Sequence, residues 1–461
     1  MWKKKFAIRK DILMEKNNTT LQVGIIGAGP SGLTLALSLS IRENVQVTIF
    51  EKAPDHRNTP SFNPLRSYTI DITGHGARAV EYLNMKSRFD KDLIPFKGIR
   101  LPVINPKLEE TYHGDGWTGS RGDIAKAILE EIIKHTSSRG NVIIHFETEA
   151  NVKDAEKGVI SYQNDTKTET FDLIVGCDGA GSTVRNYMKS TYKDFEVISL
   201  DNDNYSMMLP FDKNTNELNP SYLYIFGLPP YLAVAGAING KNGPSDPLWF
   251  CQIGFSGSKK FNSFEEAKSF LVKNYLSTGK NAITNYATDK AIEEFSKQEN
   301  ISTGRAKICS SFHVGKLVLL GDAAAPFPPV GQGVNAAMEM AIILDDCIGE
   351  ELSKIDSLKF EEIVSIAIKN FTMKWKPEAE AIRTISFRGL NLKSFHPPLY
   401  GKLKTFWIVV LHKIFHRDPM TNAKRQDMSY SQALSYQKKV DLLLISFGVF
   451  LICGCIFWLI K

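Results

Sequence analysis

Val23-Gly24-Ile25-Ile26-Gly27-Ala28-Gly29-Pro30-Ser31-Gly32-Leu33 is the stretch that decides the fold, because an apolar run passes into a glycine-rich turn and then into a helix. Its three glycines at 27, 29 and 32 have the G-x-G-x-x-G spacing. The first permits a tight turn, the second lets a pyrophosphate approach the backbone, and the third lets helix and strand pack closely. Phosphates would bind the free N–H groups at the start of the helix. The turn therefore predicts that a dinucleotide binds, but it specifies no reaction.

The size and composition of the chain are those of an ordinary globular protein. Its 461 residues are enough for two joined domains with appended segments, and 43% of them are hydrophobic and 23% charged. The net charge of +6 is small for this length, so nucleic acid is not an expected partner. The six cysteines form no C-x-x-C pair and have no histidines at ligand spacing, so we expect reduced thiols and no metal site.

The end of the chain carries the strongest topological signal. Residues 442–460 contain no charged side chain and would form about 28 Å of helix, which matches the hydrocarbon core of a bilayer. We therefore expect a transmembrane anchor at 440–461. Lys438 and Lys439 precede this run and only Lys461 follows it, so the rest of the protein should lie on the cytosolic side, at the mitochondrial outer membrane or the endoplasmic reticulum. Residues 403–415 would lie on the membrane or pack on the core.

The chain beyond the glycine turn continues as a βαβ unit. Residues 45–50 alternate as a second strand and end at Glu51, where the fingerprint places a carboxylate for ribose hydroxyls. Residues 171–177 form an almost continuous apolar run that breaks at Asp178, as expected for a buried strand of a parallel sheet. Further strands are expected at 142–146, 158–162 and 316–320, and helices at 76–83, 122–135, 333–346, 360–373 and 378–388.

Residues 190–300 have a different character. Aromatic and β-branched runs at 222–226, 231–238 and 248–255 are separated by Gly, Pro, Asn and Asp, which predicts an antiparallel sheet inserted into the first domain. Its inner face could line a pocket. The chain then returns to the first domain, where Pro326 to Val330 form a stiff loop and Gly331 to Gly333 open a helix whose free N–H groups would face a ligand.

Three separated motifs resemble the signatures of the class A, FAD-dependent aromatic hydroxylases, a family of monooxygenases. They are residues 27–32, residues 177–185 (Cys-Asp-Gly-Ala-Gly-Ser-Thr-Val-Arg), and residues 321–324 with 331–335. Over most of its length the chain is similar to the branch of this family that hydroxylates kynurenine. The resemblance implies reduction of FAD by NADPH or NADH and capture of O2 as a flavin hydroperoxide. One oxygen atom then passes to an aromatic or other small organic substrate, and no acid–base triad or metal is implied.

The resemblance also implies roles for individual residues. Glu51 would hold the adenosine ribose, Asp322 would bind the ribityl or pyrophosphate region, and the helix start at 333–335 would face the pyrimidine edge of the flavin. Asp178 and Arg185 would contact FAD and the nicotinamide cofactor. The expected cofactor-binding residues are Gly27, Gly29, Ser31, Gly32, Glu51, Lys52, Arg66, Arg121, Asp178, Arg185, Asp322, Gly331, Gly333, Val334 and Asn335, and the catalytic residues stay unassigned.

The expected fold class is α/β, and the resemblance implies how its parts are arranged. A Rossmann-like FAD-binding domain with a parallel sheet would consist of residues 21–189 and 301–350, and the antiparallel substrate-binding sheet of residues 190–300 would be inserted between them. A tail at 1–20, a helical C-terminal region at 351–439 and the transmembrane anchor at 440–461 complete the expected organisation.

Some positions depart from the family pattern. The family usually has His after Gly-Asp-Ala-Ala, where this chain has Ala325. The kynurenine branch carries an Asn and a Glu for the amino-acid end of its substrate, and those places fall near Gly389 and Leu392. Arg100 and Tyr112 are expected to match its substrate-binding arginine and tyrosine. Because each missing charged hydrogen bond costs about 1.5–3 kcal/mol, we expect a substrate that is less polar than kynurenine.

Two other functions stay open. One is an epoxidase or halogenase that acts on a lipophilic compound delivered through the membrane, which the basic apolar segment at 403–415 suggests. The other is a nonenzymatic flavin-binding membrane protein. A plain NAD dehydrogenase is disfavoured, because the motifs around Asp178 and Asp322 have no role around that cofactor alone.

Overall fold

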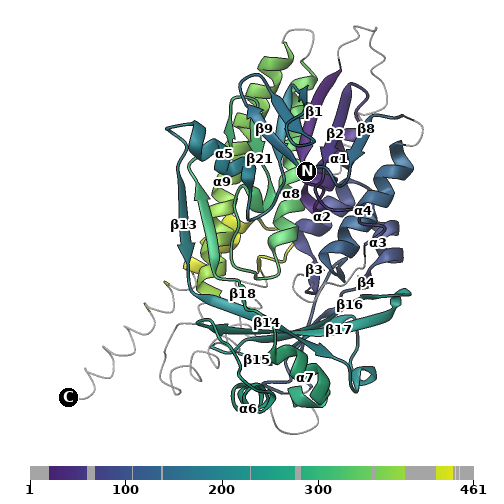
Figure 1. Ribbon diagram of the computed structural model, residues 1–461, viewed down its shortest axis with the longest axis vertical. Helices are drawn as coiled ribbons and strands as arrows, with labels where there is room; N and C mark the ends of the chain where they lie inside the picture. The colour runs from purple at the N-terminus through teal and green to yellow at the C-terminus, as the bar shows by residue number, and fades with distance from the viewer. Residues whose placement is uncertain are drawn as a thin grey trace, which may run out of the picture.

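The computed structural model describes residues 20–59, 68–105, 107–136, 139–228, 230–275, 282–354, 359–389, 422–439, 442 and 446. These residues form an α/β structure with two large sheets, one above the other in Figure 1. Helices cover both sheets. The mixed sheets and the helical C-terminal region agree with the α/β fold predicted from the sequence.

The first large sheet contains the glycine-rich turn at the end of its strand β1. Its strand order is β20-β21-β12-β1-β2-β8. The neighbours from β21 to β8 pair in parallel, as predicted, and β20 adds an antiparallel edge. The strands are β1 Leu21–Ile26, β2 Val45–Phe50, β8 Val142–His145, β12 Leu173–Gly176, β20 His313–Val314 and β21 Leu317–Leu319.

Helix α1 (Pro30–Ser40) follows the glycine turn and is buried over its whole length. It packs against both α4 (Arg121–Thr136) and α8 (Gly333–Leu352), which explains why its sequence is apolar or small on all sides. The other helices of this region are α2 Gly74–Tyr82, α3 Lys86–Asp92 and α5 Thr183–Thr191. Three smaller sheets complete it: β3 Ile70–Ile72 with β7 Trp117–Gly119 and β4 Ile94–Pro95; β9 Ala150–Asp154 with β10 Val159–Tyr162 and β11 Lys167–Thr170; and β13 Val197–Asp201 with β19 Arg305–Cys309.

The second large sheet has seven strands in the order β18-β14-β17-β16-β15-β5-β6. The predicted antiparallel runs form its centre, but β5 and β6 come from before the predicted insertion, and β5 runs parallel to β15. The sequence does not reveal these two strands because three residues are too few to show alternation. The strands are β5 Gly98–Arg100, β6 Glu109–Thr111, β14 Asn204–Phe211, β15 Tyr222–Gly227, β16 Ala233–Gly240, β17 Gly243–Ser256 and β18 Ile301–Ser302.

The two faces of this sheet have different neighbours. Its outer face carries an aromatic core that is covered by α6 (Phe264–Asn274) and α7 (Asp289–Ser296), which lie below the sheet in Figure 1. Its inner face points toward the half of the molecule that contains the first large sheet. Side chains alternate between the two faces along each strand, so Met208, Ile238 and Phe250 form a separate small buried cluster on the inner face.

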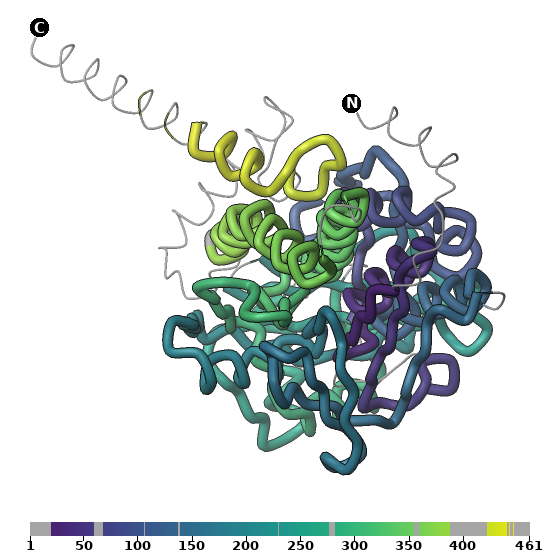
Figure 2. The backbone as a smooth tube through the Cα atoms, turned by 90° about the horizontal axis from the view of Figure 1, so that it is seen from above, coloured from purple at the N-terminus to yellow at the C-terminus, as the bar shows by residue number. Residues whose placement is uncertain are grey.

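The C-terminal region corrects one prediction. We expected two helices at 360–373 and 378–388, but α9 (Phe360–Gly389) is one helix with Pro377 inside it. Trp375 and Ile382 are both buried, on either side of the proline, and α9 packs closely on α8. Burial of this continuous apolar face offsets the hydrogen bond that proline removes. Figure 2 shows residues 422–439 lying beside α9 and α8.

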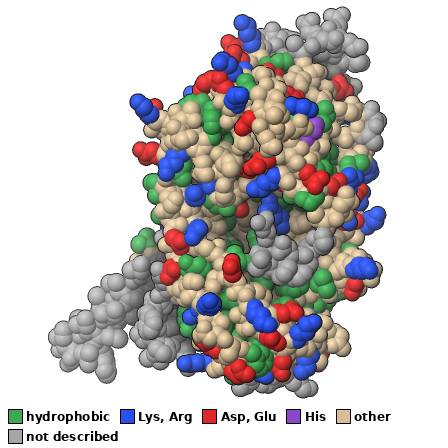
Figure 3. All heavy atoms as spheres, in the orientation of Figure 1, with side chains coloured by type: hydrophobic (Ala, Val, Ile, Leu, Met, Phe, Trp, Pro, Cys, Tyr) green, Lys and Arg blue, Asp and Glu red, His purple; other side chains and the backbone are tan. Residues whose placement is uncertain are grey.

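Several predictions concern residues outside the described part of the chain. They are the tail at 1–19, Arg66, Leu392, the segment at 403–415, and the anchor at 440–461 apart from Leu442 and Ser446. Among the described residues, no helix combines the length and apolar character that crossing a membrane requires. On the face shown in Figure 3, Lys and Arg side chains are interspersed with Asp and Glu over the described surface.

Candidate functional site

The glycine-rich turn lies between β1 and α1. At each of its three glycines a side chain would meet a different obstacle. Gly27 has a φ of +108°, and a Cβ there would lie 2.5 Å from the carbonyl oxygen of Cys177. A Cβ at Gly32 would overlap the carbonyl oxygen of Gly27. At Gly29 a Cβ would meet only the tip of a flexible side chain, Nη2 of Arg121, at 2.8 Å. The first and third glycines thus shape the turn, and the second faces a guanidinium group.

The start of α1 can receive an anion. Its N-cap residue Gly29 has no side chain to cap the helix, and the first turn contains no acidic residue. The N–H groups of this turn and the positive end of the helix dipole therefore point toward the same place as the guanidinium of Arg121. Ser31, the second residue of α1, is buried, and its hydroxyl faces α8 at the carbonyl oxygen of Ala337.

The carboxylate of Glu51 is fixed against the glycine turn. Its Oε2 accepts the N–H of Ala28 at 2.7 Å, and its Oε1 accepts the N–H of Ala53 at 2.7 Å. Next to it, the ring nitrogen Nε2 of His56 lies 2.7 Å from the carbonyl oxygen of Ala28, a contact that the sequence did not suggest. Lys52 is exposed. Glu51 is thus held at the place where the fingerprint expects a ribose acceptor.

Asp178 and Arg185 hold two loops together. Oδ2 of Asp178 accepts the N–H groups of Thr183 and Val184 at the start of α5. Arg185 is 1% exposed and donates to the carbonyl oxygens of Ala323 (2.7 Å), Asp322 (3.1 Å) and Ala180 (2.5 Å). Burial lowers the pKa of the Arg185 guanidinium. These contacts favour a positioning role for Arg185 rather than the direct cofactor contact that the resemblance implies.

Tyr68, Arg121 and Arg185 come from distant parts of the sequence and interact electrostatically with Asp322. Asp322 lies in the short 3-10 turn Gly321–Ala323. The carboxyl group of Asp322 is exposed to solvent, yet burial among surrounding protein raises its pKa, while Arg121 and Arg185 act to lower it. Burial also raises the pKa of Tyr68, and Asp322 acts in the same direction. Tyr68 was not among the predicted site residues.

The start of α8 is the second helix N-terminus of the site. Its N-cap residue is Gln332, and a Cβ built on Gly333 would meet open space. Asn335 is fully buried, and its side chain donates to the carbonyl oxygens of Asp71 (2.8 Å) and Gly331 (2.9 Å). The Asn335 side chain therefore positions the loop, and the backbone N–H groups of Gly333, Val334 and Asn335, which lack partners within the helix, are the groups available to a ligand.

The structure does not bring the two predicted substrate residues together. The guanidinium of Arg100 lies over the ring of Tyr222 and 3.3 Å from the hydroxyl of Tyr224, on the outer face of the seven-stranded sheet. It borders a cavity of about 200 Å³ that is also lined by Tyr286. The hydroxyl of Tyr112 accepts the N–H of Gly74 at 2.9 Å, at the start of α2 on the inner side. Arg100 and Tyr112 thus face opposite sides of the sheet.

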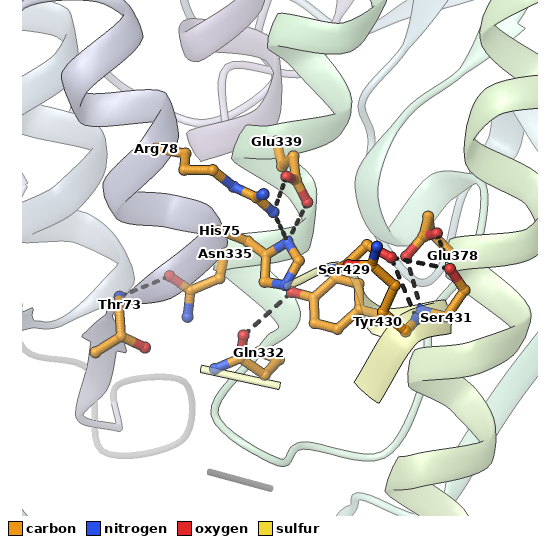
Figure 4. Close-up of polar contacts among 11 residues, drawn as sticks. Thr73, His75, Arg78, Gln332, Asn335, Glu339, Glu378, Ser429, Tyr430 and Ser431 are labelled. Atoms are coloured by element: carbon orange, nitrogen blue, oxygen red, sulfur yellow. Dashed lines mark hydrogen bonds and ion pairs between the residues drawn. The ribbon is translucent and has the colours of Figure 1, made fainter. Parts of the chain in front are cut away.

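Residues 422–439, which we call the C-terminal segment, contribute side chains that the sequence did not single out (Figure 4). The hydroxyl of Tyr430 donates to Oε1 of Gln332 at 3.1 Å, and its ring stacks on His75 at a centroid distance of 3.7 Å. His75 and Arg78 both contact the carboxylate of Glu339 in α8. Burial lowers the pKa of His75, although Glu339 opposes this effect. The Tyr430–Gln332 contact joins residues 98 positions apart, and the others join residues more than 250 positions apart, so no local sequence pattern predicts them.

The residues present fit a flavin dinucleotide. Two helix N-termini offer amides, Arg121 offers a cation beside the first of them, and Glu51 offers an acceptor at the end of β2. Positions 179, 181 and 333 have no atoms within 4 Å of an added Cβ, so the backbone is open there. Among the described residues, no group of three or more His, Cys, Asp or Glu side chains could hold a metal ion.

Comparisons with known proteins agree with this fit. Residues 20–354 match the family model described as an FAD binding domain. The kynurenine 3-monooxygenase of Candida albicans is 25% identical over 95% of both chains, and that of Sus scrofa is 25% identical over 79% of this chain and 74% of the relative.

Among solved structures, 2-methyl-3-hydroxypyridine-5-carboxylic acid oxygenase superimposes with a TM-score of 0.58 at 18% identity, over 82% of this chain and 95% of that one. A tetracycline destructase superimposes with a TM-score of 0.57 at 17% identity, over 86% of this chain and 96% of that one. These two structures share the fold.

Proposed function

Because the chain belongs to the FAD binding domain family of FAD-dependent monooxygenases, we propose that it hydroxylates an aromatic or other small organic substrate, with NADPH or NADH as reductant. The observation that carries the proposal is that α1 and α8, whose first turns have no side-chain cap, pack on each other, with Arg121 beside the start of α1 and Asp322 electrostatically coupled to Arg121. FAD supplies the redox chemistry there: it accepts electrons from the reduced nicotinamide and activates O2.

The chain's own residues bind and orient the cofactor in this proposal. The N–H groups at the start of α1 and the guanidinium of Arg121 bind the pyrophosphate, and Glu51 accepts hydrogen bonds from the adenosine ribose. Asp322 binds the ribityl region. The N–H groups at the start of α8 face the pyrimidine edge of the flavin and favour the negative charge of its reduced form. Arg185 and Asn335 hold the loops that carry these groups.

The substrate is proposed to be less polar than kynurenine. Residues 389 and 392 are Gly and Leu where the kynurenine branch is expected to have its Asn and Glu. Arg100, the expected substrate cation, lies on the outer face of the seven-stranded sheet, and Met208, Ile238 and Phe250 make the inner face apolar. A substrate held against this face would meet few charged hydrogen-bonding groups.

A membrane location is part of the proposal. The uncharged run at 442–460 and the lysines before it support a tail anchor with the catalytic region in the cytosol. The mitochondrial outer membrane and the endoplasmic reticulum are the two candidate membranes. Expression of the full chain with a fluorescent tag at its N-terminus, followed by alkaline carbonate extraction, tests this: a protein that is released by carbonate would contradict the anchor.

Substrate-stimulated oxidation of NADPH tests the proposed function. Purified full-length protein in detergent is loaded with FAD and screened against aromatic compounds of graded polarity, including kynurenine, and products are identified by mass spectrometry. We expect an apolar aromatic compound to accelerate NADPH oxidation and to gain one oxygen atom. Conversion of kynurenine to its 3-hydroxy product at ordinary enzyme rates would contradict the substrate proposal.

The same screen separates the alternative functions. Products that contain an epoxide, or a halogen when halide is present, would indicate an epoxidase or halogenase on the same fold. Bound FAD without any compound that stimulates NADPH oxidation would favour the nonenzymatic alternative. An Arg121→Met variant should lose FAD and activity together, and the exposed control variant Lys290→Met in α7 should keep both.

A further inference from the structure

One buried ion pair lies beside the start of α8 and has no role in the family pattern described above. Nζ of Lys424, in the C-terminal segment, lies 2.7 Å from Oδ2 of Asp71, in β3, and the two side chains are 12% and 3% exposed. The residues are 353 positions apart. A charge pair that is largely shielded from water is screened less by salt than an exposed pair, so its field acts on neighbouring groups.

The pair is joined directly to the loop that opens α8. A Cβ at Gly331 would lie 2.7 Å from Oδ1 of Asp71 and 3.6 Å from Nζ of Lys424. The Asn335 side chain ties the carbonyl oxygen of Asp71 to that of Gly331. Gly74 packs against the carbonyl group of Lys424, so the backbone at Lys424 is fixed as well. Both charges are therefore held at the helix N-terminus.

We propose that the Asp71–Lys424 pair sets the electrostatic potential at the N-terminus of α8 and thereby tunes the redox equilibrium of the bound flavin. This inference rests on the proposed function, because it requires FAD against the first turn of α8. The helix N-terminus favours the reduced, negatively charged flavin. The carboxylate of Asp71 alone would oppose that preference, and the ammonium group of Lys424 cancels its effect.

Several other titratable side chains in this region already have partners. His75 and Arg78 contact Glu339, which lies further along α8, and Ser431 donates to Glu378 of α9. Lys424 and Asp71 lie beside Gly331 and can be changed without removing a member of that network. Lys424 also lies over the ring of Phe96, 5.7 Å from its centroid, which adds a favourable contact for the cation.

The midpoint potential of the bound FAD tests the proposal. Lys424→Met leaves the carboxylate uncompensated, and Asp71→Asn leaves the ammonium group uncompensated. We expect Lys424→Met to shift the ratio of reduced to oxidised flavin about tenfold toward the oxidised form, and Asp71→Asn to shift it about tenfold toward the reduced form, which corresponds to about 30 mV in each direction. The double variant should return close to the wild-type potential.

The distinguishing result is that Lys424→Met and Asp71→Asn shift the midpoint potential of the flavin in opposite directions. A merely structural pair would lower stability in both single variants and would move the potential in neither or in the same direction. The matched control is the exposed ion pair Lys268–Asp289 between α6 and α7, with an Nζ to Oδ1 distance of 2.8 Å, whose Lys268→Met and Asp289→Asn variants should leave the potential unchanged. If Lys424→Met does not fold, Lys424→Gln removes the same charge with a polar side chain.

Two failures can be told apart. A wild-type protein that binds no FAD would overturn the proposed function, and this inference with it. Normal FAD binding with equal potentials in wild type and both single variants, or shifts of the same sign, would overturn the inference alone.

Discussion

Substitution of Gly29 by alanine should separate cofactor binding from folding. Gly29 is the N-cap of α1 and has φ −74° and ψ 178°, a conformation that alanine adopts without strain. The added Cβ would meet only Nη2 of Arg121, at 2.8 Å, and a long side chain can move aside. The same change at Gly32 would place a Cβ on the carbonyl oxygen of Gly27, where only the backbone could give way.

The expected effects follow from these contacts. Loss of glycine at an N-cap costs up to about 1 kcal/mol of stability, so the Gly29→Ala protein without cofactor should fold. The methyl group occupies the path of the pyrophosphate and displaces the guanidinium of Arg121, which removes at least one charge-assisted hydrogen bond of about 1.5–3 kcal/mol. Because about 1.4 kcal/mol corresponds to a tenfold change in affinity, FAD binding should weaken about 10- to 150-fold.

Titration of the cofactor-free protein with FAD, followed by quenching of flavin fluorescence, measures this change. Urea unfolding of the same samples reports stability. The control is Gly349→Ala near the end of α8, where a Cβ also meets only an arginine tip, that of Arg42. Its FAD affinity should equal that of the wild type. A Gly29→Ala protein that is folded and binds FAD within twofold of the wild type would refute the assignment of this turn to the pyrophosphate.

Three further predictions concern the loops around the site. Arg185→Met should remove the donors to three loop carbonyl groups, lower the free energy of unfolding in urea by about 3 kcal/mol or more, and weaken FAD binding. An unchanged unfolding midpoint would contradict this. Tyr430→Phe should leave the buried Gln332 acceptor without its donor and cost about 1–3 kcal/mol, whereas the control Tyr192→Phe, at an exposed hydroxyl, should cost less than about 1 kcal/mol. Burial lowers the pKa of His75, so as the pH is lowered below about 6.5 the unfolded chain binds a proton at His75 before the folded chain does, and the free energy of unfolding decreases. His75→Asn should reduce the dependence of the free energy of unfolding on pH in this range by at most about 1.4 kcal/mol per pH unit. An unchanged dependence would count against a buried neutral histidine.

The parts of the fold that the sequence predicts are those with local signals. The glycine spacing at 27–32, the apolar run before Asp178 and the alternation at 222–255 each describe an element through residues close together in the chain, and the structure confirms all three elements. Pro377 shows the limit of such signals: the proline rule predicts a break, but packing of α9 on α8 outweighs it.

The rest of the site depends on contacts between distant segments. Arg100 and Tyr112 were expected to bind the substrate together, but strand register places Arg100 beside Tyr224 on the outer face of the sheet. A three-residue strand gives no pattern from which that face could be predicted. Lys424 contacts Asp71 and Tyr430 contacts Gln332, and both partners are more than 90 positions away in the sequence. Their roles could not be derived from any periodicity.

The start of α8 is where the chain's distant parts meet, and this has a consequence for the C-terminal segment. Lys424 pairs with Asp71 beside Gly331, and Tyr430 donates to Gln332, the N-cap of the same helix. A displacement of this segment would therefore change the charge and hydrogen bonding at the α8 N-terminus. Because the proposed flavin edge lies at that turn, the C-terminal segment belongs to the cofactor site as much as the glycine turn does, although it comes about 400 residues later in the chain.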